Sequence, residues 1–460
     1  MKKLMTAYCM VLSLITLVLY IQSQREGAMR PRYYLLAAIL VLTTIIAACS
    51  GGGGGAPVIT SGGMSWMFVD GNGTNGINKD PAKNAYSPQL TVLGSKLYAI
   101  WDEGSTATQI RVAVYNGNDA APSWNFVDGN GTNGINKDAT KSAFSPQLTV
   151  LGSKLYAAWV EHNGTSYQIR VAVYNGIDTA PSWTFVDKGV NGINKDATKS
   201  AFFPKLALLG SKLYTTWIEP NSTTDQVRVA VYNGNDASPS WTFVDGNGTN
   251  GINKNPANDT SSPQVSVLGN KLYATWDEHG TASQIRVAVY NGNDAAPAWT
   301  FVDGNGTNGI NKDVTRGAGS PQLTVSGSKL YATWPEDNGI TQQVRVAVYS
   351  GDDLSPIWTF VDGNGANGIN KNAAIKAYSP QLTDRNGMLY ATWEESNQVR
   401  VAAYNGNDLS PSWTFVDGNG PNGINKDPMK SAGSAQLAAL GTKLYAIWPE
   451  AGQVRVAVAK

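Results

Sequence analysis

The sequence is short of the residue types on which thiol and metal chemistry depend. It contains two cysteines and two histidines in 460 residues. Cys9 and Cys49 both lie in the apolar N-terminal region, so the chain after residue 49 has no disulfide framework, zinc cluster or thiol nucleophile. His162 and His279 lie far apart in variable segments, where we expect them to be solvated. Two histidines are too few for a multi-histidine metal site.

A strong excess of charge of either sign is also missing. Only 15% of the residues are charged, with 35 lysines and arginines against 34 aspartates and glutamates. A nucleic-acid-binding protein usually carries a strongly basic surface, so we expect no nucleic-acid partner. The balance also excludes a long acidic tail.

Two apolar runs occupy the first 50 residues, and each follows basic residues. The runs span 8–21 and 34–48, and both are short for a helix that crosses a bilayer. The second ends in Ile46-Ala47-Ala48-Cys49, followed by Ser50 and five glycines. This sequence resembles the lipobox of bacterial lipoproteins. The resemblance implies lipidation at Cys49, and Ser50 after it implies the outer membrane of a bacterial envelope. The alternative is a transmembrane anchor that happens to contain a cysteine.

These features divide the chain into four parts. Residues 1–28 are either an over-extended start, with Met29 as the true first residue, or a first apolar helix. Residues 29–48 are expected to be a lipoprotein signal peptide, and residues 49–64 a glycine-rich tether. Residues 65–460 are expected to form one folded body, which we predict to be a monomer held at the membrane through its lipid.

An internal repeat dominates the chain after Ser65. The motif Trp-x-Phe-Val-Asp recurs seven times, at intervals of 55 to 59 residues. Its tryptophans are Trp66, Trp124, Trp183, Trp241, Trp299, Trp358 and Trp413.

Each copy predicts four short strands and no helix. In the first copy, β-branched and aromatic residues favour strands at 89–93, 96–101, 109–115 and 124–127, the first beginning after Pro88. Gly94-Ser95 is replaced by Asn386-Gly387 in the sixth copy and by Gly269-Asn270 in the fourth. All three dipeptides suit a two-residue hairpin turn, which requires a positive φ.

Seven such units predict an all-β protein, a seven-bladed β-propeller of four-stranded antiparallel blades. The chain opens with a fourth strand, near residues 65–70, and closes with the first three strands of a blade. Seven complete blades therefore require the opening strand to pair with the last one, which also removes a free sheet edge. The alternative is an open array or two smaller bodies.

An aspartate precedes most of the repeat tryptophans by five residues, as Asp119 precedes Trp124. This spacing weakly resembles the Asp-box of sialidase-like propellers, although Gly117 and Ala121 replace the serine and glycine of that motif. Kelch propellers are a second, weaker resemblance. Both resemblances imply a propeller blade, and the Asp-box implies a stabilising turn with no activity of its own.

The loop that joins each fourth strand to the next blade is rich in asparagine and glycine. In its first copy, residues 70–80, the candidate ligand-binding residues are Asn72, Asn75, Asn78 and Asp80. The loop is superficially similar to a calcium loop, but Asn75 and Pro81 occupy the positions of the required glycine and glutamate. We expect a compact turn, and the alternative is a weak calcium site. We expect no other cofactor.

A glutamate two residues after a strand tryptophan and an arginine on the following strand form a second set of candidate ligand-binding residues. The pairs are Glu103 and Arg111, Glu161 and Arg170, Glu219 and Arg228, Glu278 and Arg286, Glu336 and Arg345, Glu395 and Arg400, and Glu450 and Arg455. Because the two strands are hairpin neighbours, each pair is expected to meet on one face. One interpretation is a ring that binds polar ligands. The other, which we favour, is an ion pair that ties each blade together.

Seven near-identical units predict seven similar environments, whereas a catalytic site needs one asymmetric set of groups. We therefore expect the protein not to be an enzyme. The favoured function is multivalent binding of a glycan or cell-surface polymer through the loops of one face. The alternatives are a structural propeller that binds an envelope protein and a sialidase-like glycoside hydrolase.

Overall fold

The computed structural model describes residues 64–460 except residues 72, 105–106, 130, 132, 188, 247, 305–307, 364 and 419. Contacts divide the chain into two units, residues 1–59 and 60–460, and the second unit is described below. Cys49 and the segments 1–28, 29–48 and most of 49–64 lie outside the described residues. No helix in the described part of the chain is both long enough and apolar enough to span a bilayer.

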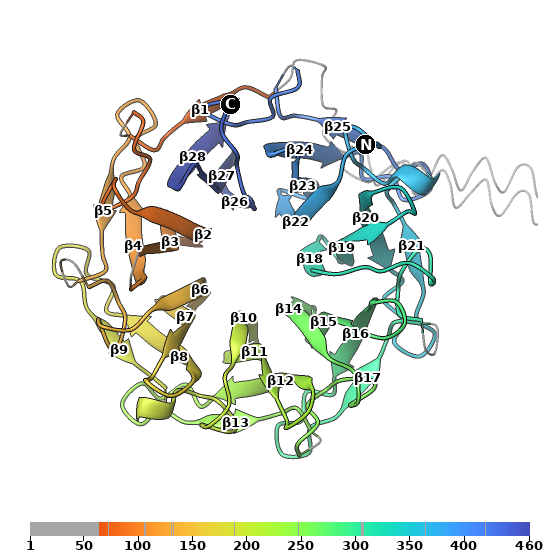
Figure 1. Cartoon of the computed structure of the whole chain (residues 1–460), viewed down its shortest axis with the longest axis horizontal. Helices are drawn as coiled ribbons and strands as arrows, with labels where there is room; N and C mark the ends of the chain where they lie inside the picture. Colours follow the sequence, from red (N-terminus) through yellow and green to blue (C-terminus); the bar gives the residue numbers. More distant parts are fainter. Residues whose placement is uncertain are drawn as a thin grey trace, which may run out of the picture. The chain divides into compact units, whose positions relative to one another are not determined.

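The second unit is a ring of seven four-stranded antiparallel sheets, as predicted (Figure 1). In blade 1, the order from the centre outward is β2 (Asn84–Leu93), β3 (Lys96–Gly104), β4 (Gln109–Tyr115) and β5 (Trp124–Phe126). Gly94 has a φ of +61°, and Asn386 and Gly387 have φ values of +55° and +80°, which confirms the two-residue hairpin turns.

The other blades repeat this order. Blades 2 and 3 comprise β6 (Ala143–Leu151), β7 (Lys154–His162), β8 (Tyr167–Tyr174), β9 (Trp183–Phe185), β10 (Phe202–Leu209), β11 (Lys212–Pro220), β12 (Asp225–Tyr232) and β13 (Trp241–Phe243). Blades 4 and 5 comprise β14 (Thr260–Leu268), β15 (Lys271–Glu278), β16 (Gln284–Tyr290), β17 (Trp299–Phe301), β18 (Gln322–Ser326), β19 (Lys329–Asp337), β20 (Gln342–Tyr349) and β21 (Trp358–Phe360). Blades 6 and 7 comprise β22 (Ala377–Arg385), β23 (Met388–Glu395), β24 (Gln398–Tyr404), β25 (Trp413–Phe415), β26 (Gln436–Leu440), β27 (Lys443–Glu450), β28 (Gln453–Ala459) and β1 (Trp66–Phe68). Two short 3-10 helices, η1 (Gly189–Asn191) and η2 (Gly365–Asn367), lie in the loops between blades.

The ring closes through β1, which pairs antiparallel with β28 (Figure 1). Trp66 lies opposite Ala459, and Phe68 lies opposite Ala457. The first strand of the propeller thus completes the last blade, as the sequence predicted, and β28 is paired on both of its edges.

The hydrophobic core lies between neighbouring blades. The strand tryptophans that precede the glutamates are fully buried; they are Trp101, Trp159, Trp217, Trp276, Trp334, Trp393 and Trp448. Trp101, for example, shares a core cluster with Tyr445 and Val456 of blade 7. Burying so large a side chain at each junction accounts for much of the stability of the ring.

An aspartate of the Asp-box-like motif also joins neighbouring blades. The Oδ1 atom of Asp178 accepts hydrogen bonds from Tyr174 of its own blade and Tyr98 of blade 1, at 3.0 and 3.3 Å, and its other oxygen pairs with Lys96. Burial acts to raise the pKa of Asp178, but these hydrogen bonds outweigh it and lower the pKa. Blade 6 has Met388 in place of the lysine, and Ser61 stands where the next aspartate would be. The sequence thus replaces both the lysine and the aspartate of this pair.

The innermost strand begins earlier than the sequence predicted. We expected it to start after Pro88, but β2 begins at Asn84, and its register with β3 shifts between Tyr86 and Gln89. Pro88 therefore lies within a β-bulge, where a missing N–H costs no ladder hydrogen bond. Blades 5 and 7 have Gly319 and Gly433 at the position of Tyr86, and there the strand begins at the glutamine, as expected.

Candidate functional site

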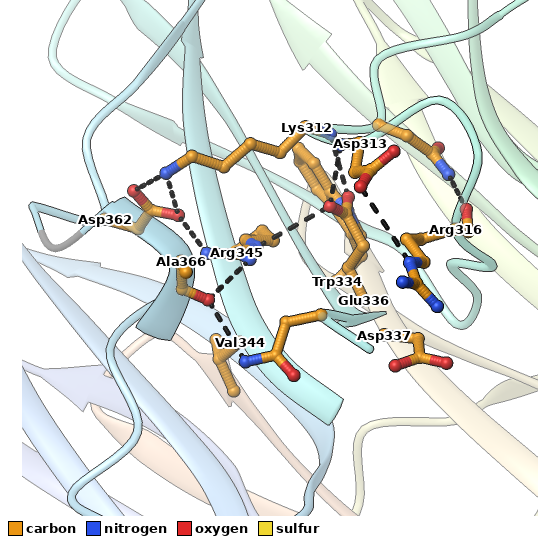
Figure 2. A network of polar contacts seen from close by, with 12 residues as sticks. Lys312, Asp313, Arg316, Trp334, Glu336, Asp337, Val344, Arg345, Asp362 and Ala366 are labelled. Carbon is orange, nitrogen blue, oxygen red and sulfur yellow. Dashed lines mark hydrogen bonds and ion pairs between the residues drawn. The ribbon is translucent and has the colours of Figure 1, made fainter. Parts of the chain in front are cut away.

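The long loops between blades are held by a buried polar network, which Figure 2 shows for blade 5. Glu336 is fully buried, and its carboxylate accepts hydrogen bonds from the Trp334 indole and from the backbone N–H groups of Lys312 and Asp313, at 2.9 to 3.0 Å. Arg345 lies beside it, with Nε 3.7 Å from Glu336 Oε1 and Nη1 3.2 Å from Asp362 Oδ2. The network therefore holds two loops to blade 5: the loop that precedes the blade, at Lys312 and Asp313, and the loop that follows it, at Asp362.

Most of this network recurs in the other blades, although the Trp276 indole of blade 4 finds no hydrogen-bond partner among the described residues. The glutamates are at most 1% exposed and the arginines 2 to 7% exposed. In all seven blades the glutamate accepts two loop N–H groups, at Lys79 and Asp80, Lys137 and Asp138, Lys195 and Asp196, Lys254 and Asn255, Lys312 and Asp313, Lys371 and Asn372, and Lys426 and Asp427. The predicted glutamates and arginines all lie inside the blades, and five of the seven pairs approach within 4.0 Å, in blades 1, 2, 4, 5 and 7. Their role in ligand binding stays a prediction, and their position fits the ion-pair interpretation.

The long loops between blades lie on one face of the propeller, called the loop face below. Lysines of these loops connect consecutive loops around this face. The Nζ atom of Lys79 bonds the carboxylate of Asp128 in the following loop at 2.8 Å and lies 4.9 Å from the Phe126 ring centroid. Equivalent bridges continue round the ring: Lys137–Asp187, Lys195–Asp245, Lys254–Asp303, Lys312–Asp362, Lys371–Asp417 and Lys426–Asp70. The last bridge closes the circle, so the loop face is a rigid platform.

The four residues singled out in the first long loop have different surroundings. Asn78 is buried: its amide nitrogen donates to the carbonyls of Lys83 and Gly452, and its oxygen accepts from the Val454 N–H. Asn75 is exposed, Asp80 is partly buried, and Asn72 lies outside the described residues. Asn78 therefore holds the loop to blade 7.

The calcium alternative rests on Asp70, whose carboxylate is bound by two cations. It is 2.8 Å from Lys426 Nζ and 3.3 Å from Arg455 Nη1. Among the residues that the structure describes, no group of three or more histidine, cysteine, aspartate or glutamate side chains has the arrangement of a metal site. Weak calcium binding by these loops stays a prediction.

A cavity of about 350 Å³ lies in the central channel, between the innermost strands. Each blade contributes the segment that reads Ser-Pro-Gln in blade 1, Ser87-Pro88-Gln89. The serine occupies the bulge with a positive φ, +50° at Ser87 and between +46° and +54° in four other blades. Residues other than glycine adopt this conformation rarely and at a cost, and such strain is concentrated at functional sites.

Blade 3 breaks the symmetry of this cavity. It has Phe203-Pro204-Lys205 where blade 1 has Ser87-Pro88-Gln89, and both Phe203 and Lys205 line the cavity. Phe203 keeps the strained conformation, with a φ of +57°, although its side chain is bulky. The channel thus has one aromatic ring and one amine among serines and glutamines.

Residues just before the cavity serines form the rim of the channel on the loop face. These rim positions are Tyr86, Phe144, Phe202, Ser261, Gly319, Tyr378 and Gly433. Tyr86 and Tyr378 are 47% and 43% exposed, and the neighbouring Phe203 is 48% exposed. Phe144 and Phe202 stack with ring centroids 6.5 Å apart and 19° between their planes. Aromatic side chains therefore occupy the rim in blades 1, 2, 3 and 6.

Carboxyl groups lie opposite three of the rim positions. Tyr86 faces Asp102 across the ladder, Ser261 faces Asp277, and Tyr378 faces Glu394. Burial raises the pKa of Asp102 to about 7, although hydrogen bonds from the Ser87 side chain and the Ser145 backbone act to lower it. Burial also raises the pKa of Glu394. Blades 2 and 3 have Val160 and Ile218 at this position, and blades 5 and 7 have Pro335 and Pro449, so only blades 1, 4 and 6 place a carboxyl behind the rim.

His279 is exposed, as expected, whereas His162 is half-buried, and both contact other side chains. The Nε2 atom of His279 lies 2.9 Å from Asp277 Oδ2 and 3.4 Å from Ser261 Oγ, and its hydrogen bond to Asp277 raises the pKa of His279. Both partners meet the same ring nitrogen, so this cluster does not have the order of a Ser-His-Asp triad. His162 packs edge-on against Tyr167, with ring centroids 4.9 Å apart.

The repeated residues of the sequence do not reveal this rim. The rim aromatics, the carboxyls opposite them and Lys205 all occur at positions where the copies differ. Alignment of the seven copies at Ser-Pro-Gln would have revealed this variation before the structure.

Comparisons with known proteins show the fold and leave the family open. No protein-family model matches the chain, and no curated protein matches it. The chain is similar to a polysaccharide lyase, with a TM-score of 0.51 and 11% identity over 81% of this chain and 89% of that one. It is also similar to an α-L-arabinofuranosidase from Fusarium graminearum, at a TM-score of 0.44 and 13% identity over 86% and 96% of the two chains. A sialidase from Trypanosoma rangeli matches at a TM-score of 0.42 and 12% identity, over 82% and 55%.

The prediction that this chain is not an enzyme is contradicted by these comparisons. The polysaccharide lyase, whose TM-score exceeds 0.5, is an enzyme with a similar fold. A repetitive blade architecture therefore gives no ground for excluding catalysis. The blades are not equivalent at the rim of the channel, which removes the symmetry argument on which the prediction rested.

Proposed function

We propose that the propeller recognises a glycan at the mouth of its central channel, on the loop face. The observation that carries this proposal is the asymmetric rim, where Tyr86, Phe203 and Tyr378 are exposed beside a cavity of serines and glutamines. A sugar ring has an apolar face of C–H groups and an edge of hydroxyls. Aromatic rings pack against the first, and carboxamides and hydroxyls both donate to and accept from the second.

The rigid platform supports this proposal. The buried network and the Lys–Asp bridges hold the loops around the mouth, so ligand binding orders few additional groups. The strained bulge at each serine turns the chain at the edge of the cavity. The glycan polymer of a cell surface, which we predicted from the sequence, suits a preformed site of this kind.

The test is glycan binding by the intact protein and by three rim variants, Tyr86→Ala, Phe203→Ala and Tyr378→Ala. Because each variant removes an exposed ring, we expect at least about a tenfold loss of affinity with no loss of fold. Leu409→Ala is the matched control: Leu409 is 99% exposed but lies in a loop between the third and fourth strands, on the opposite face. Equal binding by the rim variants and the control would exclude the mouth as the site. Capture of an envelope protein without dependence on sugar would favour the structural alternative.

Cleavage of the bound glycan is a second candidate function, and Asp102 favours it. Burial raises the pKa of this carboxyl to about 7, which is the direction that a general acid requires. Asp102 lies directly behind the cavity wall, in contact with Ser87 and Ser145. Turnover of polysaccharides by the intact protein, lost in Asp102→Asn while binding persists, would support this function. Unchanged turnover in Asp102→Asn would exclude Asp102 as the acid.

We also propose that lipid on Cys49 anchors the propeller to a bacterial membrane. The support is the lipobox-like sequence and the glycine-rich segment after it. Metabolic labelling with palmitate, followed by membrane fractionation, tests the proposal. Label on the intact protein and its absence from Cys49→Ser are expected, and equal labelling of both would contradict it.

A further inference from the structure

The channel cavity contains a single charged side chain among the residues described as lining it. The blades provide six glutamines around it: Gln89, Gln147, Gln264, Gln322, Gln381 and Gln436. Lys205 takes the seventh position. Two of the glutamines hydrogen-bond to neighbouring blades, since Gln436 accepts from the Leu90 N–H and Gln322 from the Leu382 N–H, both at 2.6 Å. These bonds join blade 7 to blade 1 and blade 5 to blade 6. Lys205 takes the place of a glutamine in this ring.

Among the described residues Lys205 has no carboxylate partner, in contrast to the thirteen lysines that bridge loops or blades. Each loop lysine that follows Ile-Asn bonds an aspartate, and six hairpin lysines do the same. Within the described part of the chain, no ion pair and no hydrogen bond of the Lys205 amine is found. Lys205 is half-buried where it lines the cavity, and this burial lowers the pKa of its amine to about 8. An ammonium ion in a confined site without a counter-ion favours the entry of an anion.

The same blade also supplies the exposed aromatic ring of the cavity. Phe203 and Lys205 are separated only by Pro204, and both face the cavity. The other blades carry serine and glutamine at these two positions. Blade 3 therefore combines an apolar surface with a cation. The carboxyls of Asp102 and Asp277 lie behind the wall and do not line the cavity. Asp277 accepts a hydrogen bond from the Ser320 N–H, which holds it there.

We propose that Lys205 binds the oxyanion of an acidic sugar, a carboxylate or sulfate group, while Phe203 packs against the ring of that sugar. Neighbouring glutamine amides donate further hydrogen bonds to the oxyanion, and such charge-assisted bonds are stronger than neutral ones. This inference rests on the proposed glycan function and specifies its ligand: a glycan that carries negative charge. The preference for acidic over neutral sugars is then set by blade 3.

The experiment measures binding of the full chain to an array of paired acidic and neutral glycans, in which each acidic glycan has a neutral partner of the same length. The intact protein is expected to bind carboxylated or sulfated glycans at least about tenfold more tightly than their neutral partners. Comparison of the carboxylated with the sulfated glycans shows which oxyanion is preferred. Lys205→Gln restores the residue that six blades carry, so it is expected to fold, to lose the preference and to keep its affinity for neutral glycans. Lys205→Arg keeps the charge and is expected to retain the preference.

Thermal unfolding separates a binding effect from a folding effect. Lys205→Gln removes a half-buried amine, so we expect its melting temperature to equal or exceed that of the intact protein. Equal affinity of the intact protein for acidic and neutral glycans would overturn the inference and leave the proposed function standing. An acidic preference that survives in Lys205→Gln would also overturn it. Absence of binding to every glycan would overturn both.

Discussion

At the scale of single residues, the buried glutamates decide how firmly the loops are held. Glu161 is fully buried and accepts hydrogen bonds at 2.9 Å from Trp159 Nε1 and from the N–H groups of Lys137 and Asp138. A buried donor that loses its acceptor keeps the full cost of its desolvation.

Glu161→Ala is therefore expected to lower the free energy of unfolding by about 3 to 5 kcal/mol, because three donors and Arg170 lose their partner. Chemical denaturation measures the change. Lys83→Ala is the control, because Lys83 and Asp80 are both well exposed and 3.7 Å apart, and it should cost less than about 1 kcal/mol. Equal effects of the two variants would contradict the role given to Glu161.

Asp102 makes the stability of the protein depend on pH. Burial raises its pKa from 3.8 to about 7, so the folded protein binds this proton more tightly than the unfolded chain does. The stabilising effect of the proton is complete below pH 4 and is lost as the pH rises to about 7.

Asp102→Asn carries no such proton, and its amide oxygen still accepts a hydrogen bond. Relative to the intact protein, the variant is expected to gain about 4 kcal/mol of unfolding free energy between pH 4 and pH 8. Denaturation at the two pH values measures this. A difference between the variant and the intact protein that is the same at both pH values would show that Asp102 is ionised in the fold.

At the scale of elements, the glycines of the long loops set how closely each loop approaches its blade. Gly134 has a φ of +59°, and a Cβ atom placed on it would lie 2.3 Å from the carbonyl oxygen of Ile110. Gly152, in a hairpin turn, has a nearly identical φ of +60° but has no atom within 4 Å of the same position.

Gly134→Ala and Gly152→Ala therefore separate backbone strain from close packing. Both variants should incur about 1 kcal/mol for a left-handed alanine, and only Gly134→Ala must also displace the loop. We expect Gly134→Ala to be the less stable by at least about 1 kcal/mol, measured by thermal unfolding. Equal melting temperatures would mean that the loop shifts freely.

At the scale of the whole molecule, stability depends on closure of the ring. Strand β1 completes blade 7, Trp66 donates a hydrogen bond to the Val416 carbonyl at 2.7 Å, and Asp70 pairs with Lys426 and Arg455. The apolar junction between blades 7 and 1 includes Val69.

Deletion of residues 65–70 is expected to lower the melting temperature by about 10 °C or more, because it removes a strand and leaves Arg455 without its carboxylate. Deletion of Gly51–Gly55, outside the propeller unit, is the control and should leave the melting temperature unchanged. Should both shortened chains melt like the intact protein, closure through β1 would be refuted.

The sequence determined the architecture because the architecture is repeated. Seven similar units, each with hairpin signals such as Gly94-Ser95 and a strand tryptophan such as Trp101, allow a ring in which each of these seven strand tryptophans is buried and the opening strand completes the last blade. The sequence also predicted how the ring closes, because the last blade takes its fourth strand from the start of the propeller and its other three strands from the end. The bulge at Ser87 was missed, because a proline within a strand usually marks its beginning.

The tertiary structure alone decided which residues form a site. Glu103 and Arg111 are chemically suited to a ligand, and only burial shows that they hold loops instead of facing solvent. Tyr86, Phe203 and Lys205 come from repeats that are far apart in the chain, and closure of the ring brings their blades around one channel. Local patterns specify strands and turns because those depend on neighbouring residues, whereas a site at the axis depends on all seven blades at once.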